Sequence, residues 1–85
     1  MGLYDSSISI AQLVYMDNIY KQFATKVKEI RLSKKLNKSK LSELAGLDIS
    51  YIGKIERGEK TPNLRTIVKL AKALDVPVKD LFNFE

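Results

Sequence analysis

The chemistry most clearly carried by this sequence is that of a cluster of positive side chains. Between residues 26 and 40 the chain has seven lysine or arginine residues and a single acid, Glu29. Such side chains neutralise phosphate groups and release the counterions that surround duplex DNA. A run of lysines is also the ordinary make-up of a solvated face, so the charge alone leaves both interpretations open. The basic residues are Lys26, Lys28, Arg31, Lys34, Lys35, Lys38 and Lys40.

The side chains on which most enzymes and metal sites depend are missing. The chain has no histidine and no cysteine, which removes the commonest general base, the commonest metal ligand and every thiolate or disulfide. The four glycines are too scattered to form a loop that cradles phosphates. We therefore expect a protein that is not an enzyme and that binds no metal, cofactor or small-molecule ligand.

Size and charge indicate one small domain with an unusual start. The 85 residues, 45% hydrophobic and 29% charged, suit a single globular core. Residues 1–20 contain two acids and no lysine or arginine, whereas residues 21–85 carry a net charge of +7. No apolar stretch approaches the roughly 20 residues that span a bilayer, and none follows the basic segment of a secretory signal. The sequence thus predicts a cytoplasmic protein without a membrane partner.

Apolar residues at three- and four-residue steps predict that these side chains are carried on helices. A first helix is expected over residues 17–35, with Asp17 as its N-cap because a carboxylate accepts from unpaired backbone N–H groups. Asn37 and Asp48 are expected to cap a second and a third helix in the same way. The residues expected to face the core of these three helices are Ile19, Phe23, Val27, Ile30, Leu41, Leu44, Ala45, Ile52 and Ile55.

Two glycines and two prolines mark the ends of the remaining elements. Gly46 and Gly58 suit left-handed C-caps of the second and third helices. A fourth helix starts at Asn63, or at Thr61 with Pro62 as its first residue, and a fifth helix of one turn begins at Pro77. The inward residues of these last two helices are Leu64, Ile67, Leu70, Ala71, Leu74 and Leu81.

The turn at Gly46 favours one arrangement of the second and third helices. Only about three residues separate them, too few for an antiparallel return, and a short glycine-containing turn joins two helices at a steep angle. This is the geometry of a helix-turn-helix, although many small helical bundles also have short glycine turns.

Four motifs between Ile30 and Phe82 add a family resemblance: IRLSKKLN, LSELAGLD, SYIGKIERGEKTP and LRTIVKLAKALDVPVKDLF. Together they resemble the Cro/repressor-type helix-turn-helix transcription regulators, also called the xenobiotic-response-element class. The run GLDISYIGKIERG is similar to regulators that control restriction–modification operons. The resemblance implies an all-α, five-helix repressor-like DNA-binding domain whose third helix enters the major groove and whose second lies across the backbone.

The resemblance also implies which residues read bases. These are the exposed positions near the start of the third helix, Ile49, Ser50 and Lys54. Lys54 can donate to guanine O6 and N7, whereas Ser50 can donate or accept. Ile49 stands where a polar side chain is usual in the family. It can contact a thymine methyl, fill space or face a dimer partner.

Phosphate contacts are implied at the start of the second helix and in the loop after the third. Such contacts position a reader without specifying sequence, and helix N-termini add partial positive charge. Lys38 stands where the family commonly has glutamine, which favours a phosphate contact over a base contact. Tyr51 offers a hydroxyl to a phosphate or is a half-buried structural aromatic. The implied phosphate-contacting residues are Asn37, Lys38, Ser39, Tyr51, Lys60 and Thr61.

Two further positions are interpreted structurally. The resemblance pairs Arg31 with Glu56, and a bidentate bridge between them would fix the third helix against the first; a direct DNA contact by Arg31 is the alternative. Gly53 is unusual inside a helix, where it costs roughly 1 kcal/mol relative to alanine. Either DNA or a neighbouring side chain approaches it closely, or this face simply tolerates it.

Residues 1–16 lie outside the resemblance and form an unassigned, apolar N-terminal extension before the DNA-binding domain, residues 17–85. Ser6 or Ser7 could cap a short helix over residues 8–15, although the alternation at its start also allows a strand. Without a basic residue this extension makes a poor minor-groove arm. Its apolar content favours packing on a partner subunit or on its own domain.

The function implied is sequence-specific binding of double-stranded DNA by a homodimer on a roughly palindromic operator. The chain would then be autoregulatory or a restriction–modification controller. Leu81, Phe82 and Phe84 are the candidates for the dimer interface; the alternative for Phe82 is that it completes the monomer core. The alternative function is a protein-interaction module, an antitoxin or antirepressor, on the same fold.

Overall fold

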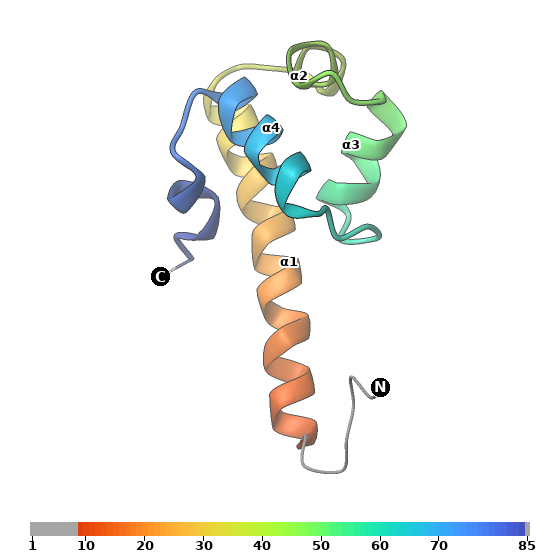
Figure 1. Cartoon of the computed structure of the whole chain (residues 1–85), viewed down its shortest axis with the longest axis vertical. Helices are drawn as coiled ribbons and strands as arrows, with labels where there is room; N and C mark the ends of the chain where they lie inside the picture. Colours follow the sequence, from red (N-terminus) through yellow and green to blue (C-terminus); the bar gives the residue numbers. More distant parts are fainter. Residues whose placement is uncertain (1–8, 85) are drawn as a thin grey trace.

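The computed structural model describes residues 9–84, apart from the side chain of Asp17. Over this range the chain is helical throughout and has no strand, which confirms the all-α prediction (Figure 1). The expected fifth α-helix is a 3-10 helix, since its first residue follows Pro77 and it spans only five residues. The elements in order are α1 (Ile10–Ser33), α2 (Lys38–Ala45), α3 (Ile49–Glu56), α4 (Leu64–Leu74) and the 3-10 helix η1 (Val78–Phe82).

Helix α1 begins earlier than the sequence indicated. Its N-cap is Ser9, whose hydroxyl accepts from the Gln12 backbone N–H while the Gln12 side chain accepts from the Ser9 backbone N–H. This reciprocal capping box satisfies the first unpaired donors, and neither glycine nor proline interrupts the 24 residues that follow. The prediction of Asp17 as N-cap is therefore wrong, because Asp17 lies within the helix.

From residue 10 onward the predicted N-terminal extension is therefore part of α1 and forms neither a helix of its own nor a strand. The boundary expected between residues 16 and 17 falls inside α1, so the extension and the rest of the chain share one continuous helix. The caps expected at Ser6 and Ser7 lie outside the described residues.

The caps of the shorter helices follow the sequence closely. The side chains of Asn37, Asp48 and Asn63 accept from backbone N–H groups at the starts of α2, α3 and α4, which selects Asn63 over Thr61 as the start of α4. Gly46 ends α2 with φ of 67°, a left-handed conformation that costs glycine little. The turn from α2 to α3 therefore depends on this glycine.

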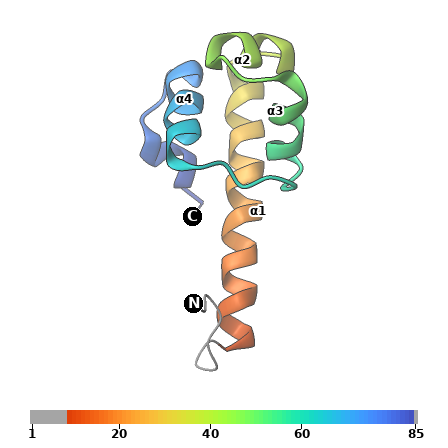
Figure 2. The same ribbon diagram turned by 45° about the vertical axis from the view of Figure 1, so that its right-hand side comes forward.

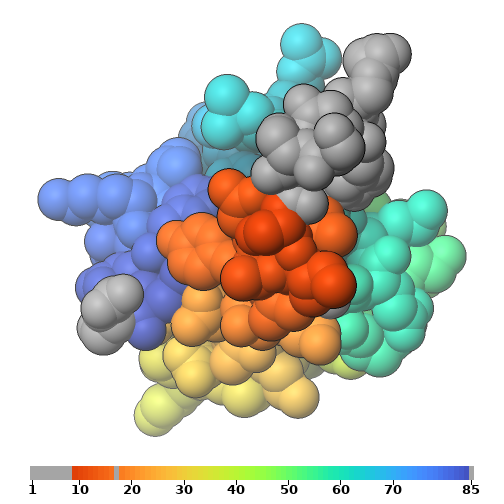
Figure 3. Space-filling model, turned by 90° about the horizontal axis from the view of Figure 1, so that it is seen from below, coloured from red at the N-terminus to blue at the C-terminus, as the bar shows by residue number. Residues whose placement is uncertain are grey.

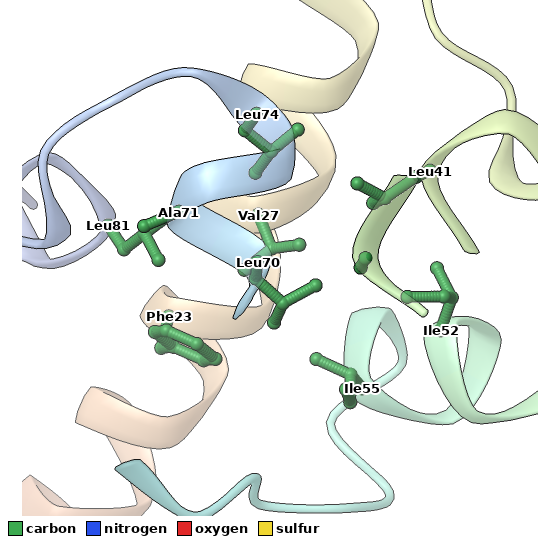
Figure 4. Close-up of a cluster of buried hydrophobic side chains, with 10 residues drawn as sticks. Phe23, Val27, Leu41, Ile52, Ile55, Leu70, Ala71, Leu74 and Leu81 are labelled. Atoms are coloured by element: carbon green, nitrogen blue, oxygen red, sulfur yellow. The ribbon is translucent and has the colours of Figure 1, made fainter. Parts of the chain in front are cut away.

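The core lies between the C-terminal half of α1 and the other helices, with α3 on one side, α4 and η1 on the other, and α2 across the top between α3 and α4 (Figure 2). Two residues expected in this core are exposed instead, Leu44 at 50% and Leu64 at 70%. They point outward because α2 buries only the stripe through Leu41 and Ala45, and α4 only its C-terminal part. The buried cluster, most of it drawn in Figure 4, contains Phe23, Val27, Leu41, Ala45, Ile52, Ile55, Leu70, Ala71, Leu74 and Leu81.

No helix in the described part of the chain has an apolar stretch long enough to cross a bilayer.

Candidate nucleic-acid interface

One side of helix α3 packs into the core, and its other side is exposed to solvent. Ile52 and Ile55 are fully buried in the core. The residues expected to read bases, Ile49, Ser50 and Lys54, are all exposed. Helical spacing places Ser50 and Lys54 away from the two buried isoleucines, whereas Ile49 precedes Ile52 by three residues and lies on the same side as it. The structure thus brings Ser50 and Lys54 together on what we call the outer side of α3, with Ile49 outside it.

The side chain of Ser50 already donates a hydrogen bond within the protein. Its hydroxyl donates to Asp48 Oδ1 over 2.6 Å, and its backbone N–H donates to the same oxygen over 2.8 Å. The hydrogen bond from the Ser50 hydroxyl, followed by the one from its backbone, lowers the pKa of the Asp48 carboxyl below its usual value. Because its hydrogen is used, the Ser50 oxygen is left with its lone pairs and acts toward a ligand as an acceptor.

Arg57 is a residue that the sequence interpretation missed. It ends α3, and its Nε donates to Glu59 Oε2 over 2.8 Å while a terminal nitrogen donates to Glu59 Oε1 over 3.3 Å. The hydrogen bond from Arg57 lowers the pKa of the Glu59 carboxyl, and the same contact raises the pKa of the guanidinium. Ser50, Lys54 and Arg57 follow one another at steps of four and three residues, a helical spacing that could have identified Arg57 from the sequence.

The guanidinium of Arg57 lies close to Gly53. A Cβ atom added to Gly53 would lie 3.0 Å from a terminal guanidinium nitrogen of Arg57. Of the interpretations left open by the sequence, close approach by a neighbouring side chain is the one that the structure supports. The bare backbone lets the guanidinium lie directly against α3.

The residues expected to contact phosphate lie at two places beside α3. Asn37, Lys38 and Ser39 start α2, and Lys60 and Thr61 lie in the loop that follows α3. All are exposed except Lys38, which is half-buried. Asn37 Oδ1 already accepts from the Lys40 backbone N–H over 2.7 Å, so only the amide nitrogen of its side chain can donate to another group.

Tyr51 has a structural role in the folded chain. Its ring is half-buried and packs against the core cluster. This supports the interpretation of Tyr51 as a half-buried aromatic, and a phosphate contact by its hydroxyl is a further role that the burial permits.

Arg31 and Glu56 form the buried pair on which the position of α3 depends. Arg31 Nε and a terminal nitrogen donate to the two carboxylate oxygens of Glu56 over 2.7 and 3.0 Å. The side chains are only 6% and 2% exposed, and the remaining terminal nitrogen of Arg31 donates to the Leu36 carbonyl over 2.8 Å. This burial favours the structural role over a direct DNA contact. The pair ties the end of α3 to α1 and to the turn before α2.

The three residues proposed for a dimer interface differ in accessibility. Leu81 is fully buried within the monomer, so its candidacy was wrong. It fills the space between α1 and α4, where η1 closes the core. Phe82 is 42% exposed and stacks on Phe23 with ring centroids 5.2 Å apart, whereas Phe84 is half-buried against Phe82. Of the three, Phe82 offers the accessible apolar surface.

Comparisons with known proteins agree with this geometry. The family described as Helix-turn-helix matches residues 27–81. The control protein C.BamHI of Bacillus amyloliquefaciens is 44% identical over 69 residues, which cover 80% of this chain and 85% of the relative. The control protein C.SmaI of Serratia marcescens is 38% identical over 71 residues, covering 84% of this chain and 83% of the relative.

A solved structure shows the same likeness in three dimensions. The restriction-modification controller protein C.AhdI from Aeromonas hydrophila superposes with a TM-score of 0.73 at 41% sequence identity. The superposition covers 74% of this chain and 96% of that one. These matches confirm the resemblance to restriction–modification controllers found in the sequence.

Proposed function

Because the chain belongs to the helix-turn-helix family, we propose that it regulates transcription by binding duplex DNA as a homodimer and that it controls a restriction–modification operon. The observation that carries this proposal is the outer side of α3. It is exposed, carries Lys54, is followed by Arg57 at the end of the helix, and lies opposite the buried Ile52 and Ile55. The similar control proteins and regulators support a regulator rather than an enzyme. Because such a regulator acts on DNA inside the cell, we propose that this protein is located in the cytoplasm.

The chemistry of α3 fits the edges of base pairs in the major groove. Lys54 can donate to O6 and N7 of guanine. The Ser50 oxygen, whose hydrogen is held by Asp48, can accept from the amino group of adenine or cytosine. Ile49 is 49% exposed and can contact a thymine methyl. The three side chains therefore favour different bases, and a reader of DNA sequence requires such a difference.

The residues around α3 fit the phosphate backbone. Lys38 at the start of α2 and Lys60 after α3 supply charge on either side of the reading helix, and Ser39 and Thr61 supply hydroxyl groups. We add Arg57 to this set, since it lies on the same side of α3 as Lys54. The backbone N–H groups at the start of α2 favour an anion as well.

The geometry of DNA supports a dimer. A single α3 spans eight residues and reaches only a few base pairs, whereas two copies related by a two-fold axis present two such helices about one DNA turn apart. The site read by this pair is an inverted repeat.

Equilibrium binding to duplex DNA at two ionic strengths tests the proposal. We expect the chain to bind a duplex of mixed sequence at low salt and the affinity to fall steeply as salt rises, because counterions are released. Lys38→Ala should make the log–log salt slope shallower by roughly one unit per half-site, and Lys79→Ala, on the exposed surface of η1, serves as the control. Absence of duplex binding at low salt would contradict the proposal and favour an antitoxin or antirepressor instead.

A further inference from the structure

The turn that ends α3 fixes the position of an acidic residue beside the candidate DNA interface. The backbone N–H of Gly58 donates to the Ile55 carbonyl over 3.0 Å, and that of Glu59 donates to the Lys54 carbonyl over 2.8 Å. With Gly58 at φ of 75°, these two bonds make the Schellman motif that often closes a helix. The motif frequently joins two apolar side chains at the positions that Lys54 and Glu59 occupy here. The turn therefore brings a carboxylate close to a lysine of the outer side of α3.

The carboxylate of Glu59 is bound by Arg57 as a phosphate group would be. Arg57 Nε donates to Glu59 Oε2 over 2.8 Å, and a terminal nitrogen donates to Oε1 over 3.3 Å. Paired N–H donors of one guanidinium bind carboxylates and phosphates alike. The hydrogen bond from Arg57 is the main cause that lowers the pKa of the Glu59 carboxyl below 4.5, and the charges of Arg57 and Lys54 lower it further. Glu59 is therefore ionised near neutral pH and close to two cations.

The pair of Arg57 and Glu59 lies at the surface, where another molecule can reach it. The two side chains are 54% and 53% exposed. Figure 3, seen along α1 from its N-terminal end, shows the residues at the end of α3 and just after it (green to turquoise) at the edge of the molecule, away from the C-terminal residues (blue). An exposed ion pair contributes little to stability. The pair can therefore open and exchange one partner for a group from outside without loss of the fold.

Glu59 occupies the donors by which Arg57 would bind an anion from outside. A guanidinium carries its five N–H donors in a fixed planar fork. The edge formed by Nε and one terminal nitrogen is taken by Glu59. A Cβ added to Gly53 would lie 3.0 Å from the other terminal nitrogen, so the backbone of α3 lies close to that part of the guanidinium. The edge of Arg57 that suits two phosphate oxygens is therefore already filled.

The charge of the pair opposes a contact with phosphate as well. An unpaired arginine that binds a DNA phosphate neutralises it and releases a counterion. Arg57 and Glu59 together have no net charge, so a phosphate gains little by approaching them, and the carboxylate repels it. A phosphate oxygen can take the filled edge of Arg57 only after the Glu59 carboxylate has moved away.

We infer that Glu59 is an intramolecular competitor of DNA, whose carboxylate occupies the site on Arg57 at which a DNA phosphate binds and so lowers the affinity for duplexes of every sequence. The inference rests on the proposed function, in which Arg57 contacts phosphate. Phosphate contacts carry no sequence information directly. The competition therefore leaves a larger share of the binding free energy to the side chains that read bases.

Equilibrium binding of Glu59→Gln to a duplex of mixed sequence tests the competition. We expect this variant of the full chain to bind at least about threefold more tightly than the unaltered chain at about 0.1 M salt, with a log–log salt slope steeper by roughly one unit per half-site. Glu29→Gln is the control matched in charge, because Glu29 pairs with Lys26 on α1 over 3.6 Å, in a hollow that Phe84 also lines. It should change the affinity much less. Equal gains for the two variants, or no gain for Glu59→Gln, would overturn the inference.

A double-mutant cycle shows whether Glu59 acts through Arg57. In the background of Arg57→Gln the carboxylate has no guanidinium to occupy, so we expect Glu59→Gln to add less than half of the gain that it gives in the unaltered chain. Circular dichroism checks that each variant is folded. A gain that stays the same without Arg57 would mean that Glu59 repels DNA directly, and it would overturn the inference.

The outcomes separate this inference from the proposed function. If the unaltered chain binds duplex DNA with a steep salt dependence and Glu59→Gln binds no more tightly, only the inference fails. Weaker binding by Glu59→Gln would also overturn it, because Glu59 would then position Arg57 for DNA instead of withholding it. If neither chain binds a duplex at low ionic strength, the proposed function fails and the inference fails with it.

Discussion

At the scale of single residues, the chain separates side chains that hold α3 from side chains that face outward from it. Glu56 belongs to α3 but points inward, where Arg31 covers both of its carboxylate oxygens. Ser50 points outward, yet its hydrogen is committed to Asp48. The side chain of Lys54 makes no hydrogen bond to another of the described residues. Of the two outward side chains, Ser50 is therefore oriented by a hydrogen bond within the protein, whereas Lys54 is not.

The Arg31–Glu56 pair should be costly to break from one side. Arg31→Met strands the Glu56 carboxylate, which is 2% exposed, and we expect the free energy of unfolding to fall by about 3 kcal/mol. Urea denaturation measures this loss. Lys40→Met, which breaks the exposed pair with Glu43, is the control and should cost less than about 1 kcal/mol. Equal losses would show that burial of the pair contributes nothing.

Lys54→Ala should weaken binding to the operator more than binding to random duplexes. If Lys54 donates to a guanine, its removal costs about 1–3 kcal/mol on the operator and relaxes the preference at one base pair per half-site. Competition binding with operator variants, changed one base pair at a time, measures this preference. Lys79→Ala should leave it unchanged. Equal weakening on operator and random duplexes would instead assign Lys54 to a phosphate.

At the scale of elements, the start of α3 combines a cap with a charge. Asp48 caps the helix, and a negative charge at a helix N-terminus is favourable. The same carboxylate holds Ser50 in place. The start of the reading helix and the orientation of one reading side chain therefore share one titratable group.

This arrangement predicts a dependence of stability on pH. The pKa of Asp48 in the folded chain lies below its ordinary value of 3.8, so the ionised carboxylate stabilises the folded state. That contribution is complete above the ordinary value and is lost as pH falls through the folded pKa. Asp48→Asn keeps a capping side chain but does not titrate. The melting temperature of the unaltered chain should exceed that of Asp48→Asn at about pH 7, and the gap should close well below pH 3.8; a constant gap would contradict the assignment.

The turn between α2 and α3 should be sensitive to loss of its glycine. Gly46 has φ of 67°, and no atom lies within 4 Å of the position that a Cβ would occupy. Any cost of Gly46→Ala is therefore backbone strain, about 1 kcal/mol in the free energy of unfolding. Gly46→Asn should cost less, because asparagine tolerates the left-handed conformation. Thermal unfolding of both variants checks the order, and equal stability of the alanine variant and the unaltered chain would contradict it.

At the scale of the whole molecule, the parts of the fold set by local signals could be predicted from the sequence. Asn37, Asp48, Asn63 and Gly46 each act within a few residues of their own position, and each proved to be the cap expected. The start of α1 was missed although its signal is local too. Ser9 and Gln12 form a capping box, and Asp17 was taken as the start because it is also a good capping residue.

The parts set by packing could not be predicted in the same way. Leu44 and Leu64 have helical spacing, but the direction in which α2 and α4 face the core decides their exposure. Leu81 was expected both to face the core and to line a dimer interface; it is buried between helices distant in sequence, which agrees with the first expectation and not with the second. Arg57 was missed although its spacing from Ser50 and Lys54 is helical, and the contact of its guanidinium with Gly53 shows that it lies along α3.

The most direct test of the proposal that α3 reads DNA is selection from a pool of random duplexes by the purified chain. The account predicts that the pool converges on an inverted repeat whose half-sites lie about one helical turn, 10–10.5 base pairs, apart. A pool that shows no enrichment after repeated rounds, from a folded chain at low ionic strength, would contradict it.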